Sequence, residues 1–301
     1  MNKRIVFVVL HYMAIKDTVE CISSIREKFK DCSYHIIVVD NCSPDKSGDE
    51  LIRMYNTSID VTVIHNDENL GFAKGNNVGI KYALSKFVFD YCAVINNDTL
   101  LIEEDLLKKL DAEYDNSHFA VLGPMIFTAD GRCDSNPVRE DLIDGTYIQK
   151  ELQSERRHLL AEEKTFIRGI RNIWFYFKPL LRRNDVESMR RKDFLHRRED
   201  VQLHGSFLVF SKAYFNVFDG FYDGTFLYHE EEILHLLVHN AGLLTVYQPD
   251  IKIYHKEDAS TNAAKSTKHE KRMLLLKNSV ASLEKLQILY NNGRNSGNLQ
   301  E

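Results

Sequence analysis

The chain has 301 residues, of which 44% are hydrophobic and 28% are charged. This composition is ordinary for a globular protein and excludes a disordered or collagen-like chain, while the length allows one large domain or two small ones. The formal net charge of −5 lacks the basic excess that is typical of nucleic-acid binding, so we expect no nucleic-acid partner.

The cysteines and the apolar runs bear on the cellular environment. Five cysteines without CxxC spacing favour free or buried thiols in a reducing cytoplasm over disulfides or zinc. The apolar run at residues 5–10 is too short for a signal peptide, and no stretch approaches the roughly 20 apolar residues that span a bilayer. We therefore expect a cytoplasmic protein that touches the inner face of the cell membrane at most peripherally.

Strand and helix signals alternate over residues 1–130, which we expect to form one half of the fold. Runs of β-branched residues predict buried strands, and one-sided apolar spacing predicts helices. A helix is expected to begin at Asp17, which forms a capping-box pattern with Glu20. The strands are expected at residues 5–10, 35–40, 61–65 and 91–96, and further helices at about 50–55 and 76–84. Such alternation predicts an α/β fold with a mostly parallel sheet wrapped by helices.

The second half of the chain is less regular. Residues 131–204 are charged and weakly periodic, which favours a helical insertion. Within it, residues 164–183 carry six Lys or Arg and no acid among aromatic side chains. This segment is either an amphipathic element on an anionic membrane surface or a solvated helix packed on the core. Residues 205–262 return to strand and helix signals (a strand from 205, a helix at 230–240, a strand near 244–247 and an apolar segment at 251–255), and residues 263–301 predict a C-terminal helix over 269–290 with a polar tail.

Several polar residues fall where ligands bind to parallel sheets, at the carboxyl ends of strands. Asp40 ends the second predicted strand, and Asn97 and Asp98 follow the fourth. Each of these residues also fits a turn or a helix cap. The run at 69–77 (NLGFAKGNN) matches neither the dinucleotide fingerprint nor the P-loop and could simply cap the next helix.

Two further groups could carry chemistry in the second half. Glu230, Glu231 and Glu232 open a predicted helix, where acids complement the helix dipole. Three adjacent carboxylates could also raise the pKa of one of them and make it a base. His255 ends an apolar segment and is either a structural histidine or a ligand.

The order and spacing of these segments resemble glycosyltransferase family 2, the inverting enzymes of the GT-A fold, and especially their bacterial rhamnosyltransferase-like, capsular or O-antigen branch. The similarity covers about residues 4–130 and 203–262. The stretches that carry it are VVDNCSPD, NLGFAKGNNVGI, VINNDT, FLYHEEEIL and IYHKEDAST.

The resemblance implies a role for each segment. Asp98 and His255 would hold Mg²⁺ or Mn²⁺ against the diphosphate of a nucleotide-sugar donor, and Glu231 would be the catalytic base, preceded in the pair by Glu230. The residues implied to line the donor pocket are Asp40, Asn69, Gly71, Lys74, Asn76 and Asn97.

The implied reaction is inverting transfer of a sugar from dTDP-rhamnose or a UDP-hexose to a hydroxyl of a glycan or a lipid-linked acceptor, in the synthesis of bacterial cell-surface polysaccharide. The chain departs from relatives that read EDxDLxxR, because it has Glu231, Ile233 and Leu237 where they have Asp, Asp and Arg. A module that binds sugar or nucleotide without turnover is therefore the alternative. A sugar nucleotidyltransferase would need a Gly-rich basic loop after the first strand, where this chain has HYMAIKD.

Overall fold

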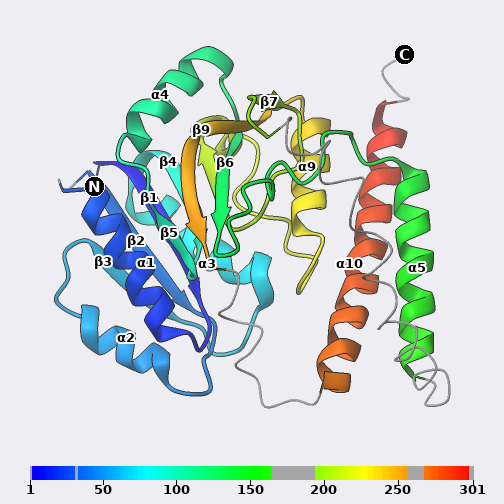
Figure 1. Ribbon diagram of the computed structural model, residues 1–301, viewed down its shortest axis with the longest axis horizontal. Coiled ribbons are helices and arrows are strands. Elements are labelled where there is room, and N and C mark those ends of the chain that lie inside the picture. The colour runs from blue at the N-terminus through cyan, green and yellow to red at the C-terminus, as the bar shows by residue number, and fades with distance from the viewer. Residues whose placement is uncertain (1, 31–32, 164–193, 257–267, 298–301) are drawn as a thin grey trace.

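The computed structural model describes residues 2–30, 33–163, 194–256 and 268–297, and Figure 1 shows the remaining residues as a thin grey trace. Its centre is a nine-stranded sheet with the order β3-β2-β1-β4-β8-β6-β9-β5, in which β7 also pairs with β9. The strands are β1 (Asn2–His11), β2 (Tyr34–Asp40), β3 (Val61–His65), β4 (Val88–Asn96), β5 (Thr99–Leu101), β6 (Val121–Thr128), β7 (Arg198–Glu199), β8 (Phe207–Ser211) and β9 (Thr245–His255).

The direction of the strands decides which residues meet at the functional edge of the sheet, by which we mean the edge formed by the carboxyl ends of the parallel strands. Strands β3, β2, β1 and β4 are parallel, so their carboxyl ends share one edge. Strand β8 runs antiparallel to β4, with Phe207 opposite Ile95, and its first residues therefore lie at the same edge. Strand β9 is parallel to β6 and antiparallel to β5, which sets His255 opposite Thr99.

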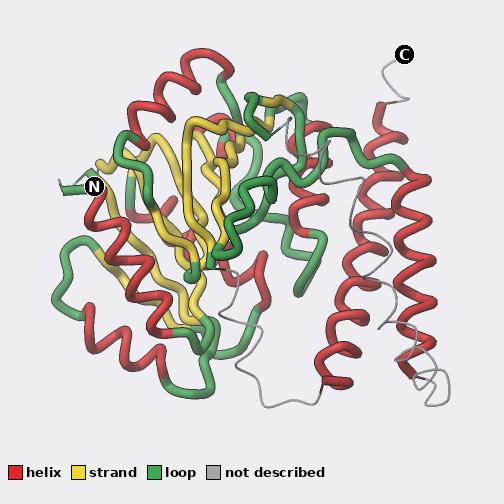
Figure 2. The backbone as a smooth tube through the Cα atoms, in the orientation of Figure 1, coloured by secondary structure: helices red, strands yellow, loops and turns green. Residues whose placement is uncertain are grey.

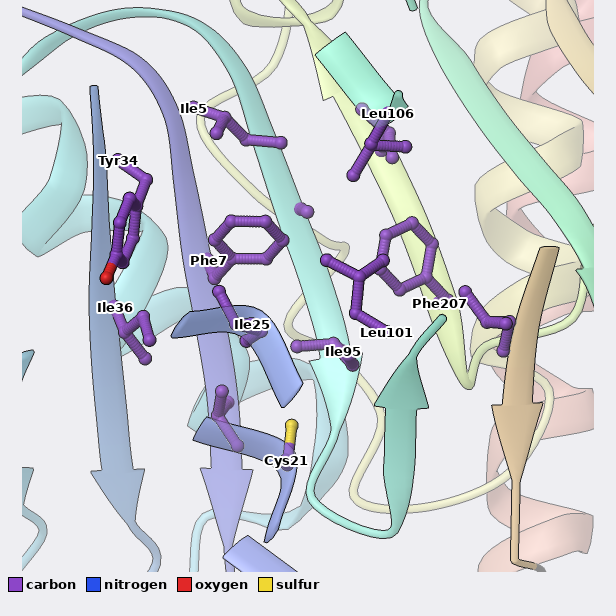
Figure 3. Close-up of a cluster of buried hydrophobic side chains, with 14 of the residues drawn as sticks. Ile5, Phe7, Cys21, Ile25, Tyr34, Ile36, Ile95, Leu101, Leu106 and Phe207 are labelled. Atoms are coloured by element: carbon purple, nitrogen blue, oxygen red, sulfur yellow. The ribbon is translucent and has the colours of Figure 1, made fainter. Parts of the chain in front are cut away.

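Helices cover both faces of this sheet (Figure 1). One face is covered by α1 (Ile15–Lys28), α2 (Ser47–Tyr55) and α4 (Leu106–Ser117), and the core under them contains Phe7, Ile25 and Phe207, which Figure 3 shows in one cluster. The other face is covered by α3 (Gly71–Lys86), α8 (Lys212–Phe215) and α9 (Glu230–Asn240). The predicted α/β sheet flanked by helices is confirmed.

The two longest helices, α5 (Gly145–Glu163) and α10 (Lys268–Gly297), pack against each other beside α9 (Figures 1 and 2). Their contact with α9 is a separate apolar cluster, to which α5 contributes Ile148, α9 contributes Ile233 and Leu236, and α10 contributes Leu283 and Leu286. The C-terminal helix α10 thereby packs against α9 and borders the space next to it.

Several predicted boundaries were wrong. Helix α1 begins at Ile15 and its cap residue Ala14 makes no side-chain cap bond, so Asp17 is no N-cap and instead binds Lys256. Helix α3 begins at Gly71 rather than at residue 76. Strand β9 extends beyond the strand predicted near 244–247 and includes the apolar segment 251–255, and α10 continues to Gly297 through the expected polar tail.

The described residues also bear on the cysteines and on the membrane. Cys21, Cys42, Cys92 and Cys133 are free thiols. Within the described ranges, every helix is too short or too polar to cross a bilayer. The segment 164–183, with its two alternative interpretations, lies outside the described residues.

Candidate active site

Asp40 ends β2 as a fully buried carboxylate. His65 donates from Nδ1 to its Oδ2 at 2.7 Å, and the backbone N–H of Ser43 donates to its Oδ1 at 3.2 Å. Helix α2 approaches so closely that a Cβ at Gly48 would come within 2.0 Å of the same carboxylate. Asp40 therefore fixes Ser43 and His65 and does not itself reach the surface.

His11, which the sequence did not single out, joins this cluster to the end of β4. The imidazole is fully buried, and burial lowers its pKa, so the ring is neutral at neutral pH. Hydrogen bonds join its Nδ1 to Thr18 at 2.7 Å and its Nε2 to Ser47 at 2.8 Å. The Thr18 hydroxyl also accepts the Asn97 side-chain amide at 3.1 Å. Asn97 is thus held from behind by a buried polar network.

The loop before α3 is organised by Asn41. Its amide donates to the side chain of Asn69 at 2.9 Å and to the carbonyl of Gly71 at 3.1 Å, while its Oδ1 accepts the N–H of Leu70 at 3.0 Å. Gly71 has a φ of +77°, and a Cβ there would lie 2.0 Å from the carbonyl oxygen of Phe226. Only glycine allows this approach, which links the loop to the segment preceding α9.

The glycines of α3 serve close packing. A Cβ at Gly75 would meet Leu10 at 2.7 Å, and a Cβ at Gly79 would meet Val8 at 2.5 Å. Their four-residue spacing places both on one face of the helix. They let α3 lie directly on β1.

The remaining predicted residues of this run differ in exposure. The Asn76 amide donates to the carbonyl of Phe72 at 3.0 Å, and its Oδ1 is buried without a partner in the described part of the chain. Asn77 clamps the backbone of Phe221 through two hydrogen bonds of 2.8 and 2.7 Å. Lys74, in contrast, is exposed. Lys74 can therefore reach a ligand without rearrangement of the core.

Asp98 and His255, distant in the sequence, meet at the functional edge. His255 Nε2 lies 3.1 Å from Asp98 Oδ1, and both residues are buried, with 7% and 8% of their surface exposed. Pairing of Thr99 with His255 sets this contact. A carboxylate and an imidazole at this separation fit two adjacent ligands of a divalent cation. No group of three metal-ligating side chains occurs among the described residues, so a cation here would need further ligands from the substrate or water.

Glu231 faces a cavity of about 590 Å³ between the sheet edge and α10. Its Oε1 accepts the N–H of Gly205 at 3.2 Å, and a Cβ at position 205 would lie 2.5 Å from that oxygen. Burial, with the neighbouring carboxylates Glu232 and Glu230, raises the pKa of Glu231 to about 7. The cavity is lined by Phe72, Asn96, Val138, Glu155, Gln202, His204, Gly205, Ser206, Leu227, Tyr228, His229, Glu230, Glu231, Glu232, Leu275, Leu276 and Ser279.

The three adjacent glutamates have different environments. Burial raises the pKa of Glu230, whose Oε1 has no partner among the described residues. For Glu232, burial raises the pKa, but the hydrogen bond from His229 at 3.1 Å and the charge of that ring outweigh it, and the net pKa is lowered. Glu231, which lines the cavity with a pKa near neutrality, is the member suited to accept a proton.

Helix α10 holds the segment that precedes these glutamates. Tyr228 and His229 both have positive φ, +74° and +65°, a strained conformation for residues with side chains. His229 is bonded to Ser279 at 2.9 Å, and Ser282 donates to the carbonyl of Leu227 at 3.1 Å. These serines carry no recognisable sequence signal, and the role of α10 was missed.

His204, which the sequence analysis also missed, lies between the Asp98–His255 pair and Glu231. It lines the cavity just before Gly205, and its ring centroid is 5.7 Å from that of His255. Burial lowers its pKa to about 4, so the ring is neutral at neutral pH. The available signal was a polar residue directly before the strand-like GSFLVF.

Comparison with known proteins identifies a family and structures of similar fold. The model of the family Glycosyl transferase family 2 matches residues 6–181. A low-salt glycan biosynthesis hexosyltransferase of Haloferax volcanii is 27% identical over 95 residues, which make up 32% of this chain and only 29% of that protein.

Two solved structures share the fold. TarS 1–349 of S. aureus in complex with UDP has a TM-score of 0.52 at 15% identity, over 91% of this chain and 71% of that one. The mannosyltransferase PcManGT from Pyrobaculum calidifontis, in complex with GDP-Man and Mn²⁺, has a TM-score of 0.52 at 12% identity, over 100% of this chain and 76% of that one. The expected GT-A fold class is confirmed.

Proposed function

Because the chain belongs to glycosyl transferase family 2, we propose that it is an inverting glycosyltransferase that moves a sugar from a nucleotide-diphosphate donor to an acceptor hydroxyl. The observation that carries this proposal is the cavity lined by Glu231, with a pKa of about 7, and by His204, whose ring contacts that of His255, the partner of Asp98. This transfer requires a base and charge-neutralising groups near one another.

The donor occupies the edge formed by β1, β2 and β4. Lys74 is exposed there and reaches the donor directly. Asp40 acts by fixing Ser43 and His65, and Asn97 is held by the network through Thr18. Asn69, Gly71 and Asn76 shape the loop that closes the pocket.

Asp98 and His255 would hold a divalent cation, Mn²⁺ or Mg²⁺. The mixed oxygen and nitrogen donors favour Mn²⁺, because Mg²⁺ prefers oxygen alone. When bound, the cation neutralises the charge that builds on the departing diphosphate. PcManGT, which shares the fold, is in complex with Mn²⁺.

Glu231 accepts the proton of the acceptor hydroxyl. The freed oxygen attacks the anomeric carbon, the bond from that carbon to the phosphate oxygen breaks, and the nucleoside diphosphate leaves with its electron pair. Attack from the face opposite the leaving group inverts the configuration. A base with a pKa near 7 is about half deprotonated at neutral pH. A large fraction of it can therefore accept a proton, and its affinity for the proton is still high.

The physiological assignment rests on the motif resemblance. The donor is dTDP-rhamnose or a UDP-hexose, the acceptor is a glycan or a lipid-linked saccharide, and the reaction belongs to the synthesis of bacterial cell-surface polysaccharide on the cytoplasmic side of the membrane. Leucines 227, 275 and 276 in the cavity wall suit an acceptor that is not purely polar.

A panel of UDP-, dTDP- and GDP-sugars, with and without Mn²⁺, tests the proposal by thermal shift and by slow release of nucleotide. One donor should raise the melting temperature only with the metal and should be hydrolysed slowly. Glu231→Gln should bind that donor normally and release nucleotide at least 100-fold more slowly. Binding without any turnover in the wild type would favour the module that binds sugar or nucleotide without turnover.

A further inference from the structure

We propose that His204 binds the donor diphosphate by donating its Nε2–H to an oxygen of the phosphate that bears the sugar. This inference rests on the proposed function and extends it to a residue outside the family motifs quoted above. Three features of the structure carry it: the fixed tautomer of the ring, its position between base and cation site, and the rigidity of its backbone.

The tautomer follows from the hydrogen bonds of Nδ1. The backbone N–H of Ser206 donates to Nδ1 at 3.1 Å, and a backbone amide can only donate. Nδ1 must therefore carry a lone pair, and the hydrogen of the neutral imidazole resides on Nε2. The Ser206 hydroxyl lies 3.0 Å from the same nitrogen, but because a hydroxyl can donate or accept, the backbone N–H alone fixes the tautomer.

The Nε2–H group of His204 faces the cavity. Nε2 has no hydrogen-bond partner in the described part of the chain, and it is not one of the unpaired polar atoms that are fully buried there. The atom is therefore accessible. The ring lines the cavity of about 590 Å³ that Glu231 also lines. An N–H group without a hydrogen-bond partner in a cavity favours a ligand that accepts a hydrogen bond there.

The position of the ring indicates which part of the ligand accepts this hydrogen bond. On one side the His255 ring is 5.7 Å away, centroid to centroid, and His255 touches Asp98. On the other side the next residue, Gly205, binds the Glu231 carboxylate. The phosphate that bears the sugar must lie between the cation and the anomeric carbon that the acceptor attacks, so it lies beside His204.

The tautomer excludes two other roles. Nε2 carries a hydrogen and so offers no lone pair to a cation, and Nδ1 is occupied by Ser206. The ring therefore neither ligates the cation nor removes a proton in this tautomer. A fixed N–H aimed at an oxygen on which charge develops stabilises the departing diphosphate without reorganisation.

The backbone around His204 is held on both sides. The Asn136 side chain accepts its N–H at 3.1 Å and donates to the carbonyl of Pro124 at 2.8 Å. The carbonyl of Ser206 accepts the N–H of Asn96 at 2.9 Å, which ties this turn to the end of β4. The Nε2–H is thus presented by a preorganised turn that directly precedes β8.

The first test uses the wild-type protein without metal. In ¹⁵N-histidine spectra, with the His204 signals assigned by their loss in His204→Gln, the two-bond nitrogen–proton correlations should report the Nε2–H tautomer. An Nδ1–H tautomer would overturn the proposal, whatever the behaviour of the variants.

The second test compares nucleoside diphosphates with monophosphates by calorimetry in Mn²⁺, using UDP and UMP, dTDP and dTMP, and GDP and GMP. His204→Leu should weaken the diphosphate that binds wild type at least tenfold, as expected for a lost bond to a charged group, and should change its monophosphate less than twofold. His204→Gln, whose amide can replace the Nε2–H, should remain within threefold of wild type for both.

The outcomes separate the inference from its premise. If no nucleotide binds the wild type, the proposed function fails and the inference fails with it. If the diphosphate binds and His204→Leu leaves its affinity unchanged, or weakens both nucleotides equally, the inference alone fails. If His204→Leu does not fold, the tautomer of the wild type decides, and an Nδ1–H tautomer refutes the inference.

Discussion

Replacing Gly205 by alanine should displace the carboxylate of Glu231, the proposed base, while leaving the fold intact. The new Cβ would lie 2.5 Å from Glu231 Oε1, whereas ordinary contact begins at 3.4 Å. The carboxylate must therefore retreat by about 1 Å, and a misplacement of that size costs on the order of 100-fold in rate. We expect the rate of nucleotide release to fall by about that factor.

The cost in stability should be small. The clashing atom is the far end of a flexible side chain, and Gly205 is not among the residues with positive φ. Alanine also loses less backbone entropy on folding than glycine. We expect the free energy of unfolding to change by less than about 1 kcal/mol.

Initial rates of nucleotide release at saturating donor, together with melting temperatures, measure both effects. Gly145→Ala is the matched control, because its Cβ would also press on a side chain, at 2.9 Å from Tyr290, but on α5 and away from Glu231. The control should retain full activity. A folded Gly205→Ala protein with more than a third of the wild-type rate would refute the argument that this contact sets the position of the base.

Four further predictions concern the same site. Because the raised pKa of Glu231 is about 7, the rate should fall as the pH drops through 7, and Glu232→Gln, which removes a neighbouring negative charge, should shift the rate profile to lower pH. A buried carboxyl with a raised pKa loses stability as the pH rises through that value, so Glu231→Gln should gain melting temperature over wild type at pH 8 but not at pH 5. His255→Ala should abolish the stabilisation by Mn²⁺ with donor, and chelation of the metal from the wild type should have the same effect in the melting assay. Asn41→Ala leaves several buried polar groups unpaired and should lower the free energy of unfolding by about 2–3 kcal/mol in urea titration.

Sequence patterns sufficed where burial alone determines structure. Strands β1, β2 and β4 contain apolar runs buried on both faces, and such runs are visible in the sequence. In β3, at the edge of the sheet, only Val61 is buried. Helix α9 was predicted with its observed bounds, because a cluster of acids opens it and a glycine with positive φ, Gly242, follows its end.

Strand β9 shows why another boundary could not be found. Pro249 and Asp250 interrupt the apolar pattern, so the predicted strand ends before them. In the structure the register between β6 and β9 shifts at Pro124 and Met125, and Gln248 and Lys252 are paired on either side of the interruption. The irregularity accommodates the proline, but it depends on the partner strand, which local sequence does not reveal.

The departures from the acceptor motif have a structural explanation in α10. Ile233 is 1% exposed and, with the partly buried Leu237, belongs to the apolar cluster that joins α9 to α5 and α10. An Asp or Arg at these positions would bury a charge in that cluster, at a cost of several kcal/mol unless it found a partner. The apolar residues instead secure α10, whose serines hold the strained segment before Glu230. Ile233 and Leu237 thus pack α9 against α5 and α10, and Glu231 lines the cavity beside them.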